Sequence, residues 1–158
     1  MNDLFAGLDV STQGQKIVII DLDKRSVIYS DSINYDVDLP KYSTLNGVLK
    51  DADFGVSESN PNMWIDSLHL LFQRLKTSTE IIQSIKAISI AGQQHGLVAI
   101  DKDGNLAKST SKLWNDFSTS EECEILTKQI GGHEQMITEV ANSQRTGYTA
   151  SKIFHMYR

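Results

Sequence analysis

Residues 4–22 have the sequence LFAGLDVSTQGQKIVIIDL, and this stretch decides the fold. It contains two apolar runs, separated by the small polar segment 11–14. Apolar runs that are joined by short polar turns predict consecutive β-strands. A third, more alternating run at residues 27–35 follows the charged segment 23–26. The sequence therefore predicts an antiparallel meander of three strands at the start of the chain.

A helix and a further strand are predicted next along the chain. Asn60 followed by Pro61 favours a helix start, because Asn caps free amides and Pro suits the first helical position. Apolar residues then recur at helical spacing as far as Leu75. Residues 85–91, IKAISIA, predict a buried strand that stops at Gly92. A strand reached through a helix is typically parallel to its neighbour, so the sequence favours a mixed α/β sheet.

The remaining segments are predicted to be loops, a hairpin and three helices. Residues 36–61 are polar and weakly periodic, which indicates a long surface excursion. Residues 97–108 are typical of a hairpin that turns at Lys102-Asp103-Gly104. The helices are one opened by a Ser118–Glu121 capping box and ended by Gly131-Gly132, one around residues 136–140, and one from about Thr149.

Composition and charge exclude several classes of protein. The chain has 158 residues, with 15 Lys and Arg against 20 Asp and Glu, so its net charge of −5 argues against nucleic-acid binding. It has one cysteine, Cys123, and therefore no internal disulfide. No apolar run approaches the roughly 20 residues that span a membrane, and the first residues lack the order of a signal peptide. We expect a cytoplasmic protein without nucleic-acid or membrane partners.

The turn after the first strand has residues suited to a phosphate and a metal ion. Asp9 ends the strand, and the segment VSTQGQK follows at residues 10–16. Turn amides and hydroxyls can hold anionic oxygens, and a carboxylate can hold Mg²⁺ through water. The alternative is that Asp9 caps an ordinary hairpin turn.

Two later loops have side chains suited to sugar hydroxyls. Residues 92–96, GQQHG, follow the predicted strand; glycine allows close backbone approach, and Gln and His offer donors and acceptors. Residues 112–116, KLWND, place an aromatic face beside an amide and a carboxylate, which suits a sugar ring. The alternatives are a solvated polar loop and a core tryptophan.

Other reactive residues show no pattern of a site. The four histidines lack a metal-ligand spacing, and His155 and Tyr157 have no visible partner. Cys123 has no adjacent base, so we expect a small apolar role for it. Neither a Walker nor a Rossmann glycine motif is present.

Together and in order, these motifs resemble the FGGY family of carbohydrate kinases. Residues 9–16 are similar to the family's phosphate loop, although Ser11 stands where most members have Gly. GQQHG at 92–96 resembles a loop typical of the family's xylulokinase branch, and LWND at 113–116 resembles the segment that follows it. Two further similarities are PNMW at residues 61–64 and GYTASK at residues 147–152. The resemblance covers nearly the whole chain.

The resemblance implies a ribonuclease-H-like fold of the actin and hexokinase type, and transfer of a phosphoryl group from MgATP to O5 of D-xylulose. Residues 1–158 would be the first, sugar-binding domain, incomplete, without the nucleotide-binding domain; the general base, an aspartate, would lie beyond residue 158, and the full-length enzyme could be a homodimer. The implied substrate-binding residues are His95, Gln94, Trp114, Asn115 and Asp116, with the last two acting as sugar contacts or loop-ordering residues. The implied phosphate-binding residues are Asp9, Ser11, Thr12, Gln13 and Lys16. Asp9 would also bind the metal ion.

Several other functions share parts of this pattern. A nuclease of the same fold needs clustered carboxylates and a basic face, and only Asp9 is well placed here. A chaperone or cytoskeletal ATPase has no need of the GQQHG and LWND segments. Within the kinases, ribulose, gluconate and glycerol are alternative substrates, and a non-catalytic sugar-binding member of the same fold is a further alternative.

Overall fold

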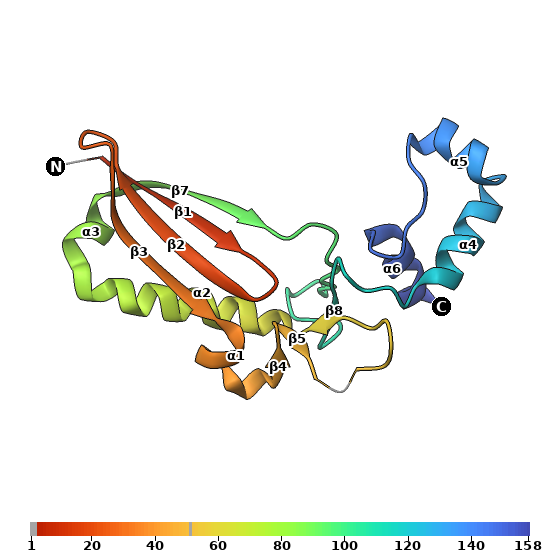
Figure 1. The fold of residues 1–158 in the computed structure, drawn as a ribbon, viewed down its shortest axis with the longest axis horizontal. Coiled ribbons are helices and arrows are strands. Elements are labelled where there is room, and N and C mark those ends of the chain that lie inside the picture. The colour runs from red at the N-terminus through yellow and green to blue at the C-terminus, as the bar shows by residue number, and fades with distance from the viewer. Residues whose placement is uncertain (1–2, 51) are drawn as a thin grey trace. The chain divides into compact units, whose positions relative to one another are not determined.

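The sheet at the start of the chain has the predicted order. β1 (Leu4–Val10), β2 (Gly14–Asp21) and β3 (Ser26–Asn34) form consecutive antiparallel pairs. β7 (Ile85–Gly92) lies on the other side of β1 and runs parallel to it, so that the strand order is β3-β2-β1-β7 (Figure 1). The predicted meander and the predicted mixed sheet are both confirmed.

The computed structural model describes residues 3–50 and 52–158, and these form two compact units. The first unit comprises residues 3–50 and 60–93, and the second comprises residues 52–59 and 94–158. Among the residues described, no helix has the length and apolar character needed to cross a membrane.

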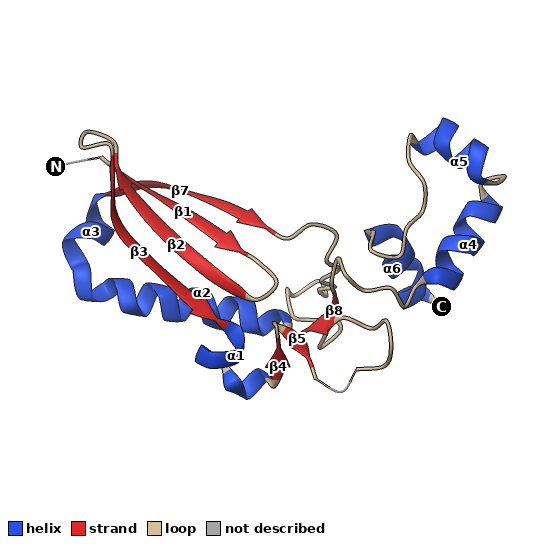
Figure 2. Ribbon diagram, in the orientation of Figure 1, coloured by secondary structure: helices blue, strands red, loops and turns tan. Residues whose placement is uncertain are grey.

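One long helix covers a face of the sheet in the first unit (Figure 2). α2 (Pro61–Leu75) begins as predicted, since the Asn60 side chain accepts a hydrogen bond from the Asn62 amide at 2.9 Å. Burying each large apolar side chain beneath it stabilises the unit by about 1.5–3 kcal/mol. The fully buried apolar residues of this core include Ile17, Ile19, Tyr35, Met63, Leu71 and Leu75. The short helices η2 (Lys76–Ser78) and α3 (Thr79–Ser84) connect α2 to β7.

The predicted surface excursion contains short ordered elements. α1 (Tyr35–Asp38) and η1 (Pro40–Tyr42) precede a small hairpin of β4 (Thr44–Leu45) and β5 (Val48–Leu49). The Asp36 carboxylate accepts hydrogen bonds from the Thr44 hydroxyl and from the amides of residues 46 and 47. These hydrogen bonds order the hairpin. The polar sequence of the segment had indicated only a loop.

β7 differs from the prediction in its burial. Its apolar run predicts a buried strand, but Ile88 and Ile90 are 47 % and 66 % exposed. The reason is that α2 packs mainly against β2 and β3, so that β7, the edge strand of the described sheet, has little cover on its faces among the described residues. Both faces of an interior parallel strand are normally covered. The amino-acid composition of β7 is therefore typical of an interior strand, although β7 lies at the edge of the described sheet.

The second unit is a small hairpin followed by three helices. β6 (Glu58–Ser59) pairs with β8 (Ser111–Lys112). The helices are α4 (Ser120–Gln129), α5 (His133–Val140) and α6 (Thr149–Tyr157). They confirm the three helices predicted from the sequence.

Two local predictions for this unit, the cap of α4 and the isolation of His155, need correction. α4 begins after Thr119 without a side-chain cap, because the Ser118 hydroxyl bonds to Asp116 instead. The predicted hairpin turn at residues 102–104 is present, with an antiparallel bridge between Ile100 and Leu106, although its arms form single bridges rather than regular strands. His155 does have a partner: its Nδ1 lies 3.1 Å from a Glu122 carboxylate oxygen, a contact between α6 and α4 that their separation in sequence concealed.

Candidate functional site

The turn between β1 and β2 is held by its own backbone and by Tyr35. The Ser11 amide and hydroxyl both donate to the Gly14 carbonyl at 2.9 Å. The Tyr35 amide donates to the Gln13 carbonyl at 3.1 Å, and the Tyr35 hydroxyl donates to the Ser11 carbonyl at 3.3 Å. Burial raises the pKa of the Tyr35 phenol to about 12, so the phenol keeps its proton and stays a donor at neutral pH. The turn is therefore fixed before any ligand arrives.

Charged side chains flank this turn. Asp9 and Lys16 are directly opposite each other in the β1–β2 pairing, and both are exposed. An open depression of about 330 Å³ adjoins the turn. Its lining includes four of the five predicted phosphate-binding residues, namely Asp9, Ser11, Gln13 and Lys16. The strand pairing thus brings together a carboxylate, an ammonium group and turn hydroxyls, a donor set suited to a hydrated metal ion and an anion.

The fifth predicted residue, Thr12, is held by two neighbouring segments. Its hydroxyl donates to Gln93 Oε1 at 3.3 Å, and the Gln93 amide donates to the Val10 carbonyl at 3.1 Å. The β4–β5 hairpin approaches from another direction, since a Cβ added at Gly47 would lie 1.8 Å from the Thr12 carbonyl oxygen. Only glycine permits this approach. Sequence reasoning considered Gln93 only as part of the GQQHG loop, toward sugar hydroxyls, and gave no role to Gly47.

His95 lies in a strained, exposed loop of the second unit. Its φ of 61° is in the left-handed region, which costs a non-glycine residue roughly 1–2 kcal/mol. Its ring stacks on that of Tyr148, with 4.5 Å between the ring centroids. Gln94 is exposed beside it. Residues held in strained conformations are often found at ligand sites, where the surrounding structure compensates the strain.

The segment after β8 divides into an exposed and a buried part. Trp114 is 50 % exposed, and Asn115 accepts a hydrogen bond from the Ser57 hydroxyl at 2.8 Å. Asp116 is fully buried and accepts from the amides of Ser57 and Ser118 at 2.8 and 3.1 Å. Burial raises the pKa of Asp116, but these bonds and the positive charge of Lys112 outweigh it and hold the pKa below its usual value. The geometry of Asp116 favours loop ordering over sugar contact.

Tyr148 and Lys152 belong to the GYTASK segment that resembles a family motif, but the sequence analysis gave neither residue a role. Tyr148 stacks on His95, as described above. Lys152 is fully buried, and its ammonium group donates to the carbonyls of residues 95, 113 and 147. Apart from that motif, the sequence does not indicate that Lys152 is buried, because the apolar spacing of α6 favours burial of Ile153 and Met156, which are 51 % and 48 % exposed.

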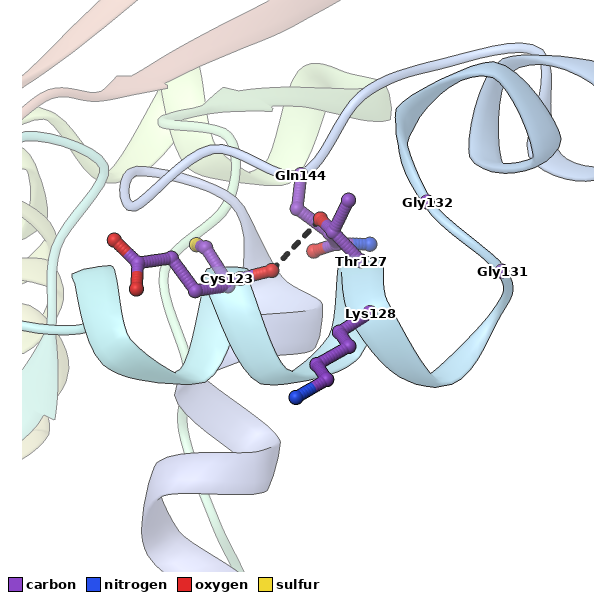
Figure 3. A pocket seen from close by; sticks show the side chains of 7 residues that line it. Cys123, Thr127, Lys128, Gly131, Gly132 and Gln144 are labelled. Atoms are coloured by element: carbon purple, nitrogen blue, oxygen red, sulfur yellow. Dashed lines mark hydrogen bonds between the residues drawn. The ribbon is translucent and has the colours of Figure 1, made fainter.

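A separate pocket of the second unit is lined by other residues (Figure 3). Its lining includes Cys123, Thr127, Lys128 and Gln144, and its volume is about 640 Å³. The Thr127 hydroxyl donates to the Cys123 carbonyl at 2.8 Å. None of the predicted site residues lines this pocket.

Known proteins that are similar to this chain are carbohydrate kinases. The chain is 34 % identical over 169 residues to a xylulose kinase of Schizosaccharomyces pombe, a match that covers 95 % of this chain and 30 % of that protein. The chain thus spans about three tenths of that curated relative. A xylulose kinase structure from Rhodospirillum rubrum has a TM-score of 0.79 at 19 % identity, covering 98 % of this chain and 29 % of that one. A gluconate kinase structure from Lactobacillus acidophilus has a TM-score of 0.77 at 20 % identity, covering 100 % and 29 %.

These structures share the actin- and hexokinase-like fold, so the predicted fold class is confirmed. The model of the N-terminal domain of the FGGY family of carbohydrate kinases matches residues 4–156. That match spans both the Ser11–Gly14 turn and the His95 loop. The chain belongs to the FGGY family of carbohydrate kinases.

Proposed function

We propose that this chain is the N-terminal part of a kinase that transfers the γ-phosphate of ATP to D-xylulose, giving D-xylulose 5-phosphate. The observation that carries the proposal is the exposed, left-handed His95 in a GQQHG loop directly after β7. Loops on a rigid scaffold are where binding side chains concentrate. The kinship with xylulose kinases supports this choice of sugar.

The Ser11–Gly14 turn would hold the phosphate groups of ATP. Asp9, Ser11, Thr12, Gln13 and Lys16 are the proposed contacts. Among residues 3–50 and 52–158, no three His, Cys, Asp or Glu side chains gather as a metal site. Asp9 alone still fits Mg²⁺, which commonly takes one carboxylate and completes its shell with phosphate oxygens and water. The metal would neutralise charge on the transferred phosphate, while the turn supplies its position.

The second unit would hold the sugar. We assign His95 and Gln94 as hydrogen-bonding partners of its hydroxyls, and the exposed Trp114 face as an apolar support. Asn115 is a weaker contact, because its side-chain oxygen already accepts from Ser57. Asp116 would order the loop that carries Trp114.

We propose that the rest of the enzyme supplies the general base and most of the adenosine site. The exposed apolar residues of β7 support this, since an interior strand composition needs cover on both faces. On this proposal the enzyme is cytoplasmic, and the 158 residues alone are inactive. The family similarity leaves gluconate, glycerol and ribulose as alternative substrates, as it does a non-catalytic sugar-binding role.

A coupled ATPase assay on the complete protein tests the substrate. The panel is D-xylulose, D-ribulose, gluconate and glycerol, with the 158-residue chain as a parallel sample. We expect the highest kcat/KM with D-xylulose and no turnover by the chain alone. A higher kcat/KM for another sugar would replace the substrate, and an absence of turnover with all four would favour the non-catalytic role.

A further inference from the structure

Lys152 is an unusual residue for the interior of a protein. It lies on α6 with no exposed surface, although lysine is almost never fully buried without a partner. Its Nζ donates to three backbone carbonyls, each at 2.7 Å: those of His95, Leu113 and Gly147. An ammonium group has three N–H donors, so each one is used. Lys152 has no donor left for a substrate, which excludes a direct catalytic or phosphate-binding role in this arrangement.

Two of the three acceptors belong to the two segments of the proposed sugar site, and the third belongs to the segment whose Tyr148 ring stacks on His95. One is the carbonyl of His95 itself, and the other two are next to Trp114 and Tyr148 in sequence. Because each oxygen lies at the same short distance from one nitrogen, no two of them can be further apart than twice that distance. Lys152 therefore fixes the spacing of segments that are distant in sequence.

Other contacts converge on the same segments. The His95 and Tyr148 rings are stacked, and a Cβ at Gly147 would lie 2.4 Å from the Trp114 carbonyl oxygen. His95 also has the left-handed backbone that neighbouring bonds must hold in place. The Lys152 ammonium group therefore donates a hydrogen bond directly to the carbonyl of this strained residue.

We propose that Lys152 is a positioning residue that holds the His95 loop, the Trp114 segment and the Gly147–Tyr148 turn in the arrangement that binds the sugar. This inference rests on the proposed sugar-binding function of the His95 loop. Burial lowers the pKa of Lys152, and the positive charge of Lys112 lowers it further. The Asp116 carboxylate raises this pKa but does not offset the other two effects. Only the protonated amine can donate to all three carbonyls.

The test compares Lys152→Met with Lys128→Met in the 158-residue chain by NMR. Lys128 is an exposed lysine on α4 of the same unit and serves as the matched control. Two quantities are measured: the shift that the stacked Tyr148 ring imposes on the His95 ring protons, and the affinity for D-xylulose by titration. The amide signals of residues 94–158 report whether the second unit stays folded, and those of residues 3–50 do so for the first unit.

In Lys152→Met we expect the His95 ring shift to move toward its free value and xylulose affinity to fall at least about tenfold, since a supporting group that is lost leaves a site loose. Lys128→Met should match the wild type in both. Lys152→Gln, which has two donors, should show a smaller change in the same direction. A Lys152→Met chain with the wild-type His95 shift and affinity would overturn the proposal. Unfolding of the second unit in both Lys152 variants would also overturn it, because the role would then be structural.

The two proposals fail in different ways. If the wild-type chain binds no xylulose, the sugar assignment fails, while the His95 ring shift still reports whether Lys152 positions the loop.

Discussion

Gly147→Ala should loosen the proposed sugar site through a single clash. The added Cβ would lie 2.4 Å from the Trp114 carbonyl oxygen, and real Cβ contacts are essentially never below 3.0 Å. The difference, 3.0 minus 2.4, is 0.6 Å, so either the turn or the Trp114 backbone must move by at least that distance. The atoms that would have to move belong to the backbone on both sides of the clash. The Gly147 carbonyl also accepts a hydrogen bond from Lys152, which holds the turn in place.

The expected cost follows from this overlap. Overpacking a well-filled site costs about 1–3 kcal/mol, which corresponds to about a 5- to 150-fold change in the unfolding equilibrium constant. The control is Gly96→Ala, on the His95 loop, where the nearest atom to the added Cβ is 4.0 Å away. We expect little change there.

Urea unfolding, followed by Trp114 fluorescence, measures this difference. A Trp64→Phe background removes the second tryptophan, whose buried indole N–H has no hydrogen-bond partner among the residues that the structure describes. Gly147→Ala should unfold at lower urea than Gly96→Ala and should bind D-xylulose more weakly. Equal midpoints for the two variants would refute the close approach of Gly147 to Trp114.

Three other outcomes are expected. Asp9→Asn in the complete enzyme should lower kcat strongly with unchanged folding by circular dichroism; near-normal turnover would return Asp9 to the role of capping a turn. Gly47→Ala should weaken the apparent affinity for ATP, because its Cβ would lie 1.8 Å from the Thr12 carbonyl oxygen and its φ is 76°; an unchanged KM for ATP would contradict a phosphate role for that turn. Acid should destabilise the second unit through Asp116, because folding lowers the pKa of this carboxyl group. The stability that the ionised carboxylate contributes is present above the unfolded pKa of 3.8 and is lost as the pH falls through the folded pKa. Asp116→Asn should flatten this pH dependence in urea melts, and an unchanged slope would contradict it.

The sequence predicted the sheet well because local patterns determine it. The apolar runs of residues 4–22 and the Asn60–Pro61 helix start are signals contained in short windows, and β1, β2 and α2 follow them. The burial of β7 could not be predicted in the same way. An apolar run indicates what a strand needs, whereas its position at a sheet edge depends on the other strands present.

The candidate site residues come from motifs in the sequence, whereas the contacts that hold them depend on tertiary structure. Nothing near Lys152 in the sequence indicates that three distant carbonyls meet at its ammonium group. The α6 pattern even favours the opposite face, since Ile153 is half exposed while Ser151 and Lys152 are buried. Likewise, Asp36 and Gly47 belong to a segment whose polarity indicated only a loop. These residues are found through hydrogen bonds between segments far apart in sequence.

The central claim, that the His95 loop binds the sugar, is tested most directly by steady-state kinetics of His95→Ala in the complete enzyme. Losing a partner for a sugar hydroxyl costs about 1–3 kcal/mol, or about a 5- to 150-fold rise in KM. The account predicts this rise for D-xylulose, with the KM for ATP nearly unchanged. An unaltered KM for D-xylulose, in a folded and active His95→Ala enzyme, would contradict it.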